Sequence, residues 1–239
     1  MSNHQSLNTK EHAELRIHTD HGVERGDAVM ACLIVPHEFR QVQGDYPILF
    51  RRNDDGSGFN ALAMLGFENG ENLYLEGDKW DASYIPLSMS IKPFLVGRPR
   101  EEGGEPQVHI DMDHPRVSTS GEGTRVFDED GRPTPFLERI SDQLGALHAW
   151  FQETPAFFQA LERYDLLEPF SLDVPLSNGT RQSLVGYHII NEDKFFALDV
   201  TALDELRQTG MLTPIFMALA SLSQLSGLIS RKDRKENLG

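Results

Sequence analysis

The sequence predicts an α+β fold with antiparallel or mixed sheets built from hairpins, and with packed helices in the C-terminal half. Short apolar runs separated by turn-forming residues fill the first half of the chain, which is typical of strands in hairpins. In the second half, apolar residues recur at three- and four-residue steps, as on one face of a helix. Because strands precede helices instead of alternating with them, the pattern favours α+β over a doubly wound sheet.

Residues 1–27 are polar and include four of the nine histidines. This composition predicts a flexible or loosely docked N-terminal arm, followed by a single domain over residues 28–239. The arm has no basic stretch followed by an apolar one, so we expect no classical secretory signal. Cys32 is the only cysteine, so a disulfide within the chain is excluded. It lies in an apolar run, and a single buried thiol is compatible with a reducing compartment.

The first strands are expected from residue 29 onward. Residues 29–35 are apolar throughout and predict a buried strand that Pro36 ends. Residues 46–50 and 59–67 flank a turn-forming segment, which predicts a hairpin. Further strands are expected at residues 72–75, at Trp80, and at residues 107–112, 124–127 and 186–190.

Residues 98–107 are the most linker-like segment of the chain, because charged residues, glycine and proline dominate it. The strand that follows, residues 107–112, alternates apolar and polar side chains. This alternation predicts an outer strand of a sheet.

The helices are expected in the second half. Residues 136–151 carry an apolar stripe at helical spacing, and Thr154 with Pro155 predicts the N-cap and first turn of a second helix. Residues 191–194 resemble a turn that joins the strand 186–190 to another strand at 195–198.

The C-terminal segment is expected to be helical, with Asp199 or Thr201 as an N-cap and Gly210 as the end of its first helix. Residues 211–230 contain no charge and precede a basic flank, which is the crude pattern of a membrane span. Serine, threonine and glutamine interrupt this stretch, and its apolar residues recur at helical spacing. We therefore expect a packed amphipathic helix and no membrane span, with a tail anchor as the alternative.

The net charge of −15 bears on partners more than on fold. A surface this negative repels nucleic-acid phosphates and anionic lipids, so neither is expected as a general partner. A soluble cytoplasmic protein that binds a protein partner or a small ligand is the expectation, and the sequence does not fix an oligomeric state.

Several short motifs occur in a fixed order between residues 28 and 232. They include Tyr46-Pro47-Ile48-Leu49-Phe50, Trp80-Asp81-x-x-Tyr84-Ile85-Pro86, Lys92-Pro93-Phe94 and Phe127-Asp128-Glu129-Asp130-Gly131. In this order and spacing they resemble the SapC family of bacterial proteins.

The family takes its name from a protein associated with a bacterial surface layer, and some members carry transporter-like labels. Family members tend to lie near genes for outer-membrane receptors, cupin-like proteins and halogenase-like proteins. The resemblance therefore implies a non-enzymatic accessory or binding protein linked to cell-surface, uptake or modification systems. Export to the cell surface by a nonclassical route is the alternative to a cytoplasmic location.

The densest cluster of unusual residues predicts a ligand- or partner-binding surface, because amphipathic aromatic side chains beside a carboxylate suit small ligands and peptides. The expected residues are Trp80, Asp81, Tyr84, Pro86, Lys92 and Phe94. The alternative is a hairpin corner in which Trp80 fills the core and Asp81 caps backbone amides.

A metal-dependent enzyme is the second hypothesis. His109 and Asp111 lie two residues apart on an expected strand, so their side chains point to one face, and His188 could complete a non-haem iron site. The alternative is that the segment is simply polar. The sequence contains no Gly-rich phosphate loop, nucleophile elbow, CxxC or HExxH motif, so an enzyme is the less favoured class.

Overall fold

A computed structural model describes residues 3–97 and 107–238. Residues 98–106 of the expected linker therefore lie outside the described residues. The described chain divides into two compact units. The first unit comprises Met1–Asp27, Leu75–Trp80 and Leu87–Ala149, and the second comprises Ala28–Tyr74, Asp81–Pro86 and Trp150–Gly239.

The first unit is built on short antiparallel pairings. Its main sheet has the strand order β1 (His4–Ser6), β9 (Gln107–Asp111), β8 (Phe94–Gly97). Two smaller pairings join β2 (Arg16–Ile17) with β10 (Thr124–Arg125) and β6 (Leu75–Glu76) with β7 (Lys79–Trp80). The helical elements of the first unit are α1 (Thr9–His12), η1 (Val23–Arg25), α3 (Leu87–Ser90) and the first part of α4 (Pro135–Arg163).

The strand β9 was expected at the edge of a sheet, and this expectation is wrong. It lies between β1 and β8, with His4 opposite Asp111 and Phe94 opposite Ile110. The sequence pattern misleads because the covering strand comes from the N-terminal segment, more than 100 residues away. Residues 1–27 thus hold paired strands, and Leu15 and Ile17 belong to the hydrophobic core of the first unit. The prediction of a single domain over residues 28–239 stays a prediction.

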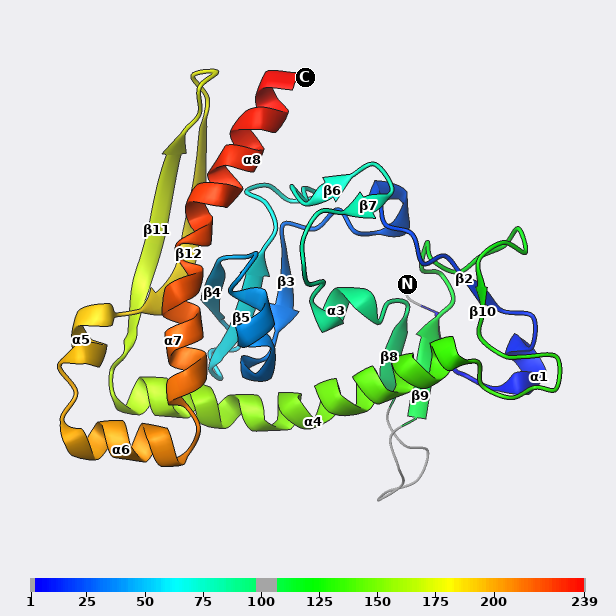
Figure 1. The fold of residues 1–239 in the computed structure, drawn as a ribbon, viewed down its shortest axis with the longest axis horizontal. Helices are drawn as coiled ribbons and strands as arrows, with labels where there is room; N and C mark the ends of the chain where they lie inside the picture. The colour runs from blue at the N-terminus through cyan, green and yellow to red at the C-terminus, as the bar shows by residue number, and fades with distance from the viewer. Residues whose placement is uncertain (1–2, 98–106, 239) are drawn as a thin grey trace. The chain divides into compact units, whose positions relative to one another are not determined.

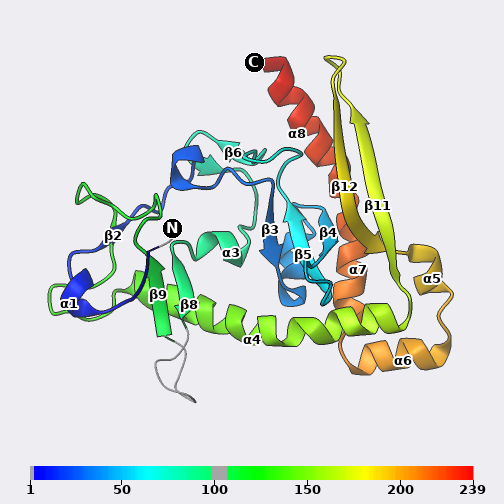
Figure 2. The ribbon, with the colours of Figure 1, turned by 180° about the vertical axis from the view of Figure 1, so that it is seen from behind.

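The second unit contains an antiparallel sheet of order β11 (Leu167–Pro175), β12 (Arg181–Ile190), β4 (Ile48–Arg52), β5 (Phe59–Met64), β3 (Ala31–Ile34). The predicted hairpin across residues 53–58 is confirmed as β4 and β5. The helical elements of the second unit are η2 (Pro36–Glu38), α2 (Phe39–Val42), the second part of α4, α5 (Glu192–Phe196), α6 (Val200–Gln208), α7 (Leu212–Ser221) and α8 (Gln224–Leu238). Figures 1 and 2 show α7 beside β12. The α+β class is thereby confirmed.

The helix α4 does not break where the sequence predicts a break. It continues through Pro155, and the Thr154 hydroxyl donates to the Trp150 carbonyl at 3.0 Å instead of capping a new helix. An interior proline removes one helical hydrogen bond and costs about 3 kcal/mol. Burial of Phe157 and Phe158, exposed by only 1% and 3%, offsets this cost and keeps the helix continuous.

Residues 191–198 also differ from expectation. They form the helix α5 and its cap instead of a turn and a strand, because the Asn191 side chain accepts a hydrogen bond from the Lys194 amide at 2.8 Å. Asparagine favours both turns and N-caps, so the local sequence does not separate the two. The prediction of Asp199 as a cap is confirmed, since its side chain accepts from the Ala202 amide at 2.8 Å.

The uncharged C-terminal stretch forms α7 and most of the first half of α8. Within the described residues, the helical segment Leu212–Asn237 is the one stretch long and apolar enough to cross a membrane, by length and composition alone. Only 22% of its most apolar window is buried inside the structure. Its buried side chains include Ile215, Ala218 and Leu228, which belong to the core of the second unit.

Candidate functional site

The six residues expected to form a binding surface are distributed over both units. Trp80, Lys92 and Phe94 belong to the first unit, and the other three belong to the second. Trp80 and Phe94 are 8% and 3% exposed, and Pro86 is buried as well. The Trp80 ring lies edge-on to His21, with centroids 5.6 Å apart. Burial of this kind supports the alternative in which Trp80 fills the core.

Tyr84 and Asp81 make contacts that hold the second unit together. The Tyr84 hydroxyl donates to Oε1 of the buried Glu38 at 2.8 Å, and burial together with this carboxylate raises the pKa of Tyr84. Asp81 accepts from Nη1 of Arg231 at 2.6 Å, and the Arg231 guanidinium lies 4.4 Å from the centroid of the Tyr74 ring. Asp81 thus pairs with an arginine side chain rather than capping backbone amides as the hairpin-corner alternative proposes.

The three residues of the metal hypothesis lie on two different strands. His109 and Asp111 share β9 in the first unit, whereas His188 lies on β12 in the second. No group of three or more histidine, cysteine, aspartate or glutamate side chains within the described residues is arranged to hold a metal ion. Asp111 Oδ1 instead accepts from the amides of Asn3 and Asp113. The His188 ring lies edge-on to Phe59 at 4.9 Å between centroids.

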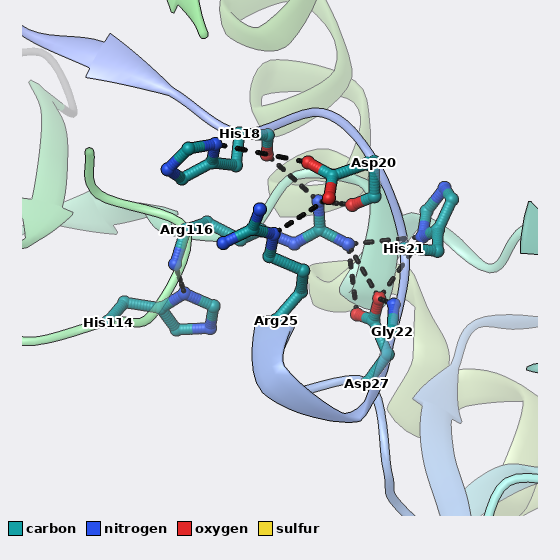
Figure 3. A network of polar contacts seen from close by, with 8 residues as sticks. All are labelled: His18, Asp20, His21, Gly22, Arg25, Asp27, His114 and Arg116. Carbon is teal, nitrogen blue, oxygen red and sulfur yellow. Dashed lines mark hydrogen bonds and ion pairs between the residues drawn. The ribbon is translucent and has the colours of Figure 1, made fainter. Parts of the chain in front are cut away.

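One polar network of the first unit surrounds a buried ion pair (Figure 3). Arg116 Nη2 donates to both carboxylate oxygens of Asp27, at 3.0 and 2.8 Å, and the two side chains are 5% and 0% exposed. Arg116 Nη1 donates to the carbonyls of His18 and Asp20. This arginine therefore joins the loop that precedes η1 to the segment that follows β9.

The surroundings of Asp27 explain its ionised state. Burial raises the pKa of Asp27, but the hydrogen bond from His21 and the positive charge of Arg116 outweigh burial, so the pKa lies below its usual value. The Gly22 amide also donates to Asp27 Oδ2, at 3.1 Å. His21, Gly22 and Arg116, which contact Asp27, all belong to the first unit. A carboxylate held this way orients its neighbours, and this arrangement indicates a structural role.

A cavity of about 320 Å³ lies in the second unit, on elements that the sequence separates widely. Its wall is formed by η2 and α2, by the middle of α4, and by the connection from α6 into α7. The lining residues are Pro36, His37, Arg40, Glu153, Thr154, Phe157, Thr209, Gly210, Met211, Thr213, Pro214 and Met217.

Each part of this wall has a local cause. Pro36 begins the short helical turn that presents His37. Gly210, at φ 77°, adopts the left-handed conformation that ends α6, and the Met211 amide then donates to the Leu206 carbonyl. The chain reverses at this point, so that Thr213 and Met217 of α7 reach the cavity.

The charged and titratable groups of the cavity wall are His37, Arg40 and Glu153. The His37 ring stacks on Trp150, with centroids 5.1 Å apart and planes 3° from parallel. His37 Nε2 lies 3.3 Å from Glu153 Oε2, so these two side chains are partners for each other. Arg40 is exposed and supplies a positive charge at the wall. An apolar cavity with a few convergent polar groups is the usual form of a small-molecule site.

Sequence reasoning missed this cavity. Pro36 and Met217 are about 180 positions apart, and neither lies in an unusual motif. The only local signals were Pro36 as the end of a strand and Gly210 as the end of a helix, both of which mark element boundaries and not ligands.

Comparison with protein families gives one match. The SapC family model covers residues 7–228 of the 239 residues. Comparisons with curated proteins and with solved structures each gave no match. The family match extends over nearly all of both units, so it covers the ion pair at Asp27 and the cavity at Arg40 together. The chain belongs to the SapC family.

Proposed function

We propose that this SapC-family chain is a binding protein for a small amphipathic carboxylate, which occupies the cavity beside Arg40. The observation that carries the proposal is the cavity itself, because its volume of about 320 Å³ lies within the range of about 300–1,000 Å³ typical of ligand sites. A non-enzymatic binding role accords with the accessory role that the family resemblance implies.

The wall supports an apolar ligand body. Phe157, Met211, Pro214 and Met217 supply hydrocarbon and thioether surface. Phe157 is held rigidly, since it is 1% exposed and its ring lies edge-on to Phe39 at 5.7 Å between centroids. The two methionines adapt their shape to an irregular ligand.

The charges support an anionic head group. Glu153 is already paired with His37, whereas Arg40 has no ion pair within the described residues. A guanidinium binds a carboxylate through two parallel hydrogen bonds, which fixes the orientation of the ligand as well as its charge. The ligand therefore places its carboxylate at Arg40 and its apolar body against Phe157.

Titration calorimetry with 4-phenylbutyrate tests the proposal. The probe binds the wild-type protein at one site, and Arg40→Gln weakens binding about tenfold, because one charge-assisted contact is lost. Thr213→Trp, at an exposed position on the wall, blocks the cavity and abolishes binding.

The matched control is Arg234→Gln, which removes the same charge from an exposed position on α8. Its affinity for 4-phenylbutyrate equals that of the wild type. Equal weakening by Arg234→Gln would reveal a general response to net charge, and undiminished binding by Thr213→Trp would place the ligand elsewhere. Either result would overturn the proposal.

A further inference from the structure

A second cavity lies on another part of α4, and its chemistry is opposite to that of the first. It has a volume of about 210 Å³ and lies between the β4–β5 turn and the second part of α4. The lining residues are Asn53, Ser57, Gly58, Phe59, Asn60, Phe151, Thr154, Pro155, Phe158, Gln159 and Glu162. No lysine or arginine is among them, whereas a glutamate is.

Three phenyl rings form its apolar surface. Phe59 and Phe158 are stacked with centroids 6.0 Å apart and are 5% and 3% exposed, so both are fixed by the core. The Phe59 ring already holds a cation, since the Arg52 guanidinium carbon lies 4.7 Å from its centroid. Phe151 is 48% exposed and is the ring whose surface remains open to a ligand.

One polar group of this cavity is a buried hydrogen-bond acceptor. Asn53 Oδ1 is buried and has no hydrogen-bond partner in the described part of the chain, although the Nδ2 of the same side chain donates to Ser57 Oγ at 3.2 Å. A buried acceptor without a donor is costly, and a ligand donor would remove that cost.

A second acceptor comes from the proline in the helix. Pro155 has no N–H, so the Phe151 carbonyl lacks the donor that an ordinary residue at position 155 would supply. Phe151 and Pro155 both line the cavity. The same feature that contradicts the expected helix break therefore leaves a carbonyl of a cavity-lining residue without its usual helical donor.

Glu162 completes the arrangement with a negative charge. It is exposed and makes no ion pair within the described residues. Aromatic faces, a carboxylate and the Asn53 acceptor together select a cation that carries N–H donors. A quaternary ammonium can contact the rings and the carboxylate, but it has no N–H to donate to Asn53 Oδ1.

From this arrangement we propose a binding site for a small primary ammonium, with an apolar body against Phe151 and Phe158 and the ammonium between Asn53 and Glu162. The free amine of a metabolite and the side chain of an exposed lysine share this chemistry. The site is independent of the carboxylate cavity, because the two share only Thr154 among their lining residues.

The test uses the full chain and phenethylammonium as the probe, with binding measured by titration calorimetry. The probe binds saturably, whereas its neutral analogue 2-phenylethanol and tetramethylammonium bind at least about fivefold more weakly. Glu162→Gln and Phe151→Ala, both at exposed positions, each weaken phenethylammonium binding roughly five- to tenfold.

The matched control is Glu138→Gln, which removes an exposed carboxylate from the distant end of the same helix. It leaves the affinity for phenethylammonium unchanged. Equal weakening by Glu138→Gln would show that the net negative charge alone attracts the probe, and binding of 2-phenylethanol as tight as that of phenethylammonium would show an apolar cavity without ammonium recognition. Either result overturns the proposal, as does an absence of saturable binding.

A further arm distinguishes the two sources of the ammonium. An Nα-acetyl-lysine amide peptide and phenethylammonium are compared for competition at the site. Displacement of phenethylammonium by the peptide supports a lysine side chain as the natural occupant. Failure of the peptide to displace it supports a free amine.

Discussion

Arg116 and Asp27 form an ion pair in which one nitrogen, Nη2, donates to both carboxylate oxygens at 3.0 and 2.8 Å. The pair is almost completely shielded from water, with side-chain exposures of 5% and 0%. Water therefore cannot replace either partner when the other is removed, and the stability of the first unit depends on keeping both.

We expect Asp27→Asn to lower the free energy of unfolding by about 3–5 kcal/mol, because it leaves the Arg116 guanidinium buried without a countercharge. Urea denaturation followed by circular dichroism measures the change. The double variant Asp27→Leu/Arg116→Met should lose less stability than the sum of the single changes, since it leaves no buried charge. Additive losses would contradict a coupled pair. Asp130→Asn, in the exposed pair with Arg132, should change stability little.

His114 gives the same region a dependence on pH. Burial, followed by the positive charges of Lys92 and Arg116, lowers the pKa of His114 below its usual 6.5, although Asp111 and Asp27 oppose this shift. The unfolded chain then binds the proton more readily than the folded chain. The stability contributed by neutral His114 is complete above pH 6.5 and declines as the pH falls below 6.5 towards the folded-state pKa.

Denaturation at a series of pH values between 7 and 5 measures this decline. His114→Asn should flatten the curve in this window, because an asparagine oxygen can still accept from the Arg116 amide, as His114 Nδ1 does at 3.2 Å, but does not titrate. The loss due to Asp27 falls in a separate window at lower pH, since its pKa lies below the usual 3.8. An unchanged slope in His114→Asn would assign the dependence to another group.

The sequence predicts an element correctly where neighbouring residues determine its structure. It fails where contact with a segment far along the chain determines the position of the element. The hairpin β4–β5 and the cap at Asp199 depend on neighbouring residues, and both are found as expected. The central position of β9 depends on β1, and no pattern near Gln107 reports that partner.

The same reason explains why neither cavity was expected. Local signals around Thr154 and Pro155 indicate a helix start, but burial of Phe157 and Phe158 against the sheet outweighs them. Both cavities border this stretch of α4 and take their other walls from segments far along the chain. A binding surface is predicted around Trp80 because large aromatic residues are rare in the sequence. Such residues are often buried in a core, as Trp80 is here.

Pro155→Ala should stabilise the protein by about 1–3 kcal/mol, because alanine supplies an N–H to the Phe151 carbonyl and favours the helix. Thermal and urea denaturation measure the gain. If the proposed ammonium site is correct, the same substitution weakens phenethylammonium binding while it raises stability, since the carbonyl is then satisfied. Gln159→Ala, at an exposed position one turn further along α4, is the control for stability and should produce a much smaller gain.

Lys232 attaches the last helix to the second unit. It is 1% exposed, and its Nζ lies 3.0 Å from Glu71 Oε1, 3.4 Å from Glu68 Oε1 and 2.9 Å from Glu236 Oε1. Burial lowers the pKa of Lys232, but the bonds to Glu236 and Glu71 outweigh burial and raise it. Lys232→Met should lower the free energy of unfolding by about 3 kcal/mol, because Glu71 is then buried without its nearest cation. Lys235→Met, at a side chain 59% exposed, should have a small effect in the same urea titration.

The segment Leu212–Asn237 passes a test of length and composition for a membrane span, and we nevertheless expect it to stay in the fold. Insertion would extract Lys232 from its three carboxylates and leave Glu71 buried without it. In flotation with neutral phosphatidylcholine vesicles, the wild-type protein should stay with the aqueous fraction. Lys232→Leu removes the buried charge that pairs this segment with Glu71, so flotation of this variant alone would support that pairing as the reason. Flotation of the wild-type protein would support the tail-anchor alternative.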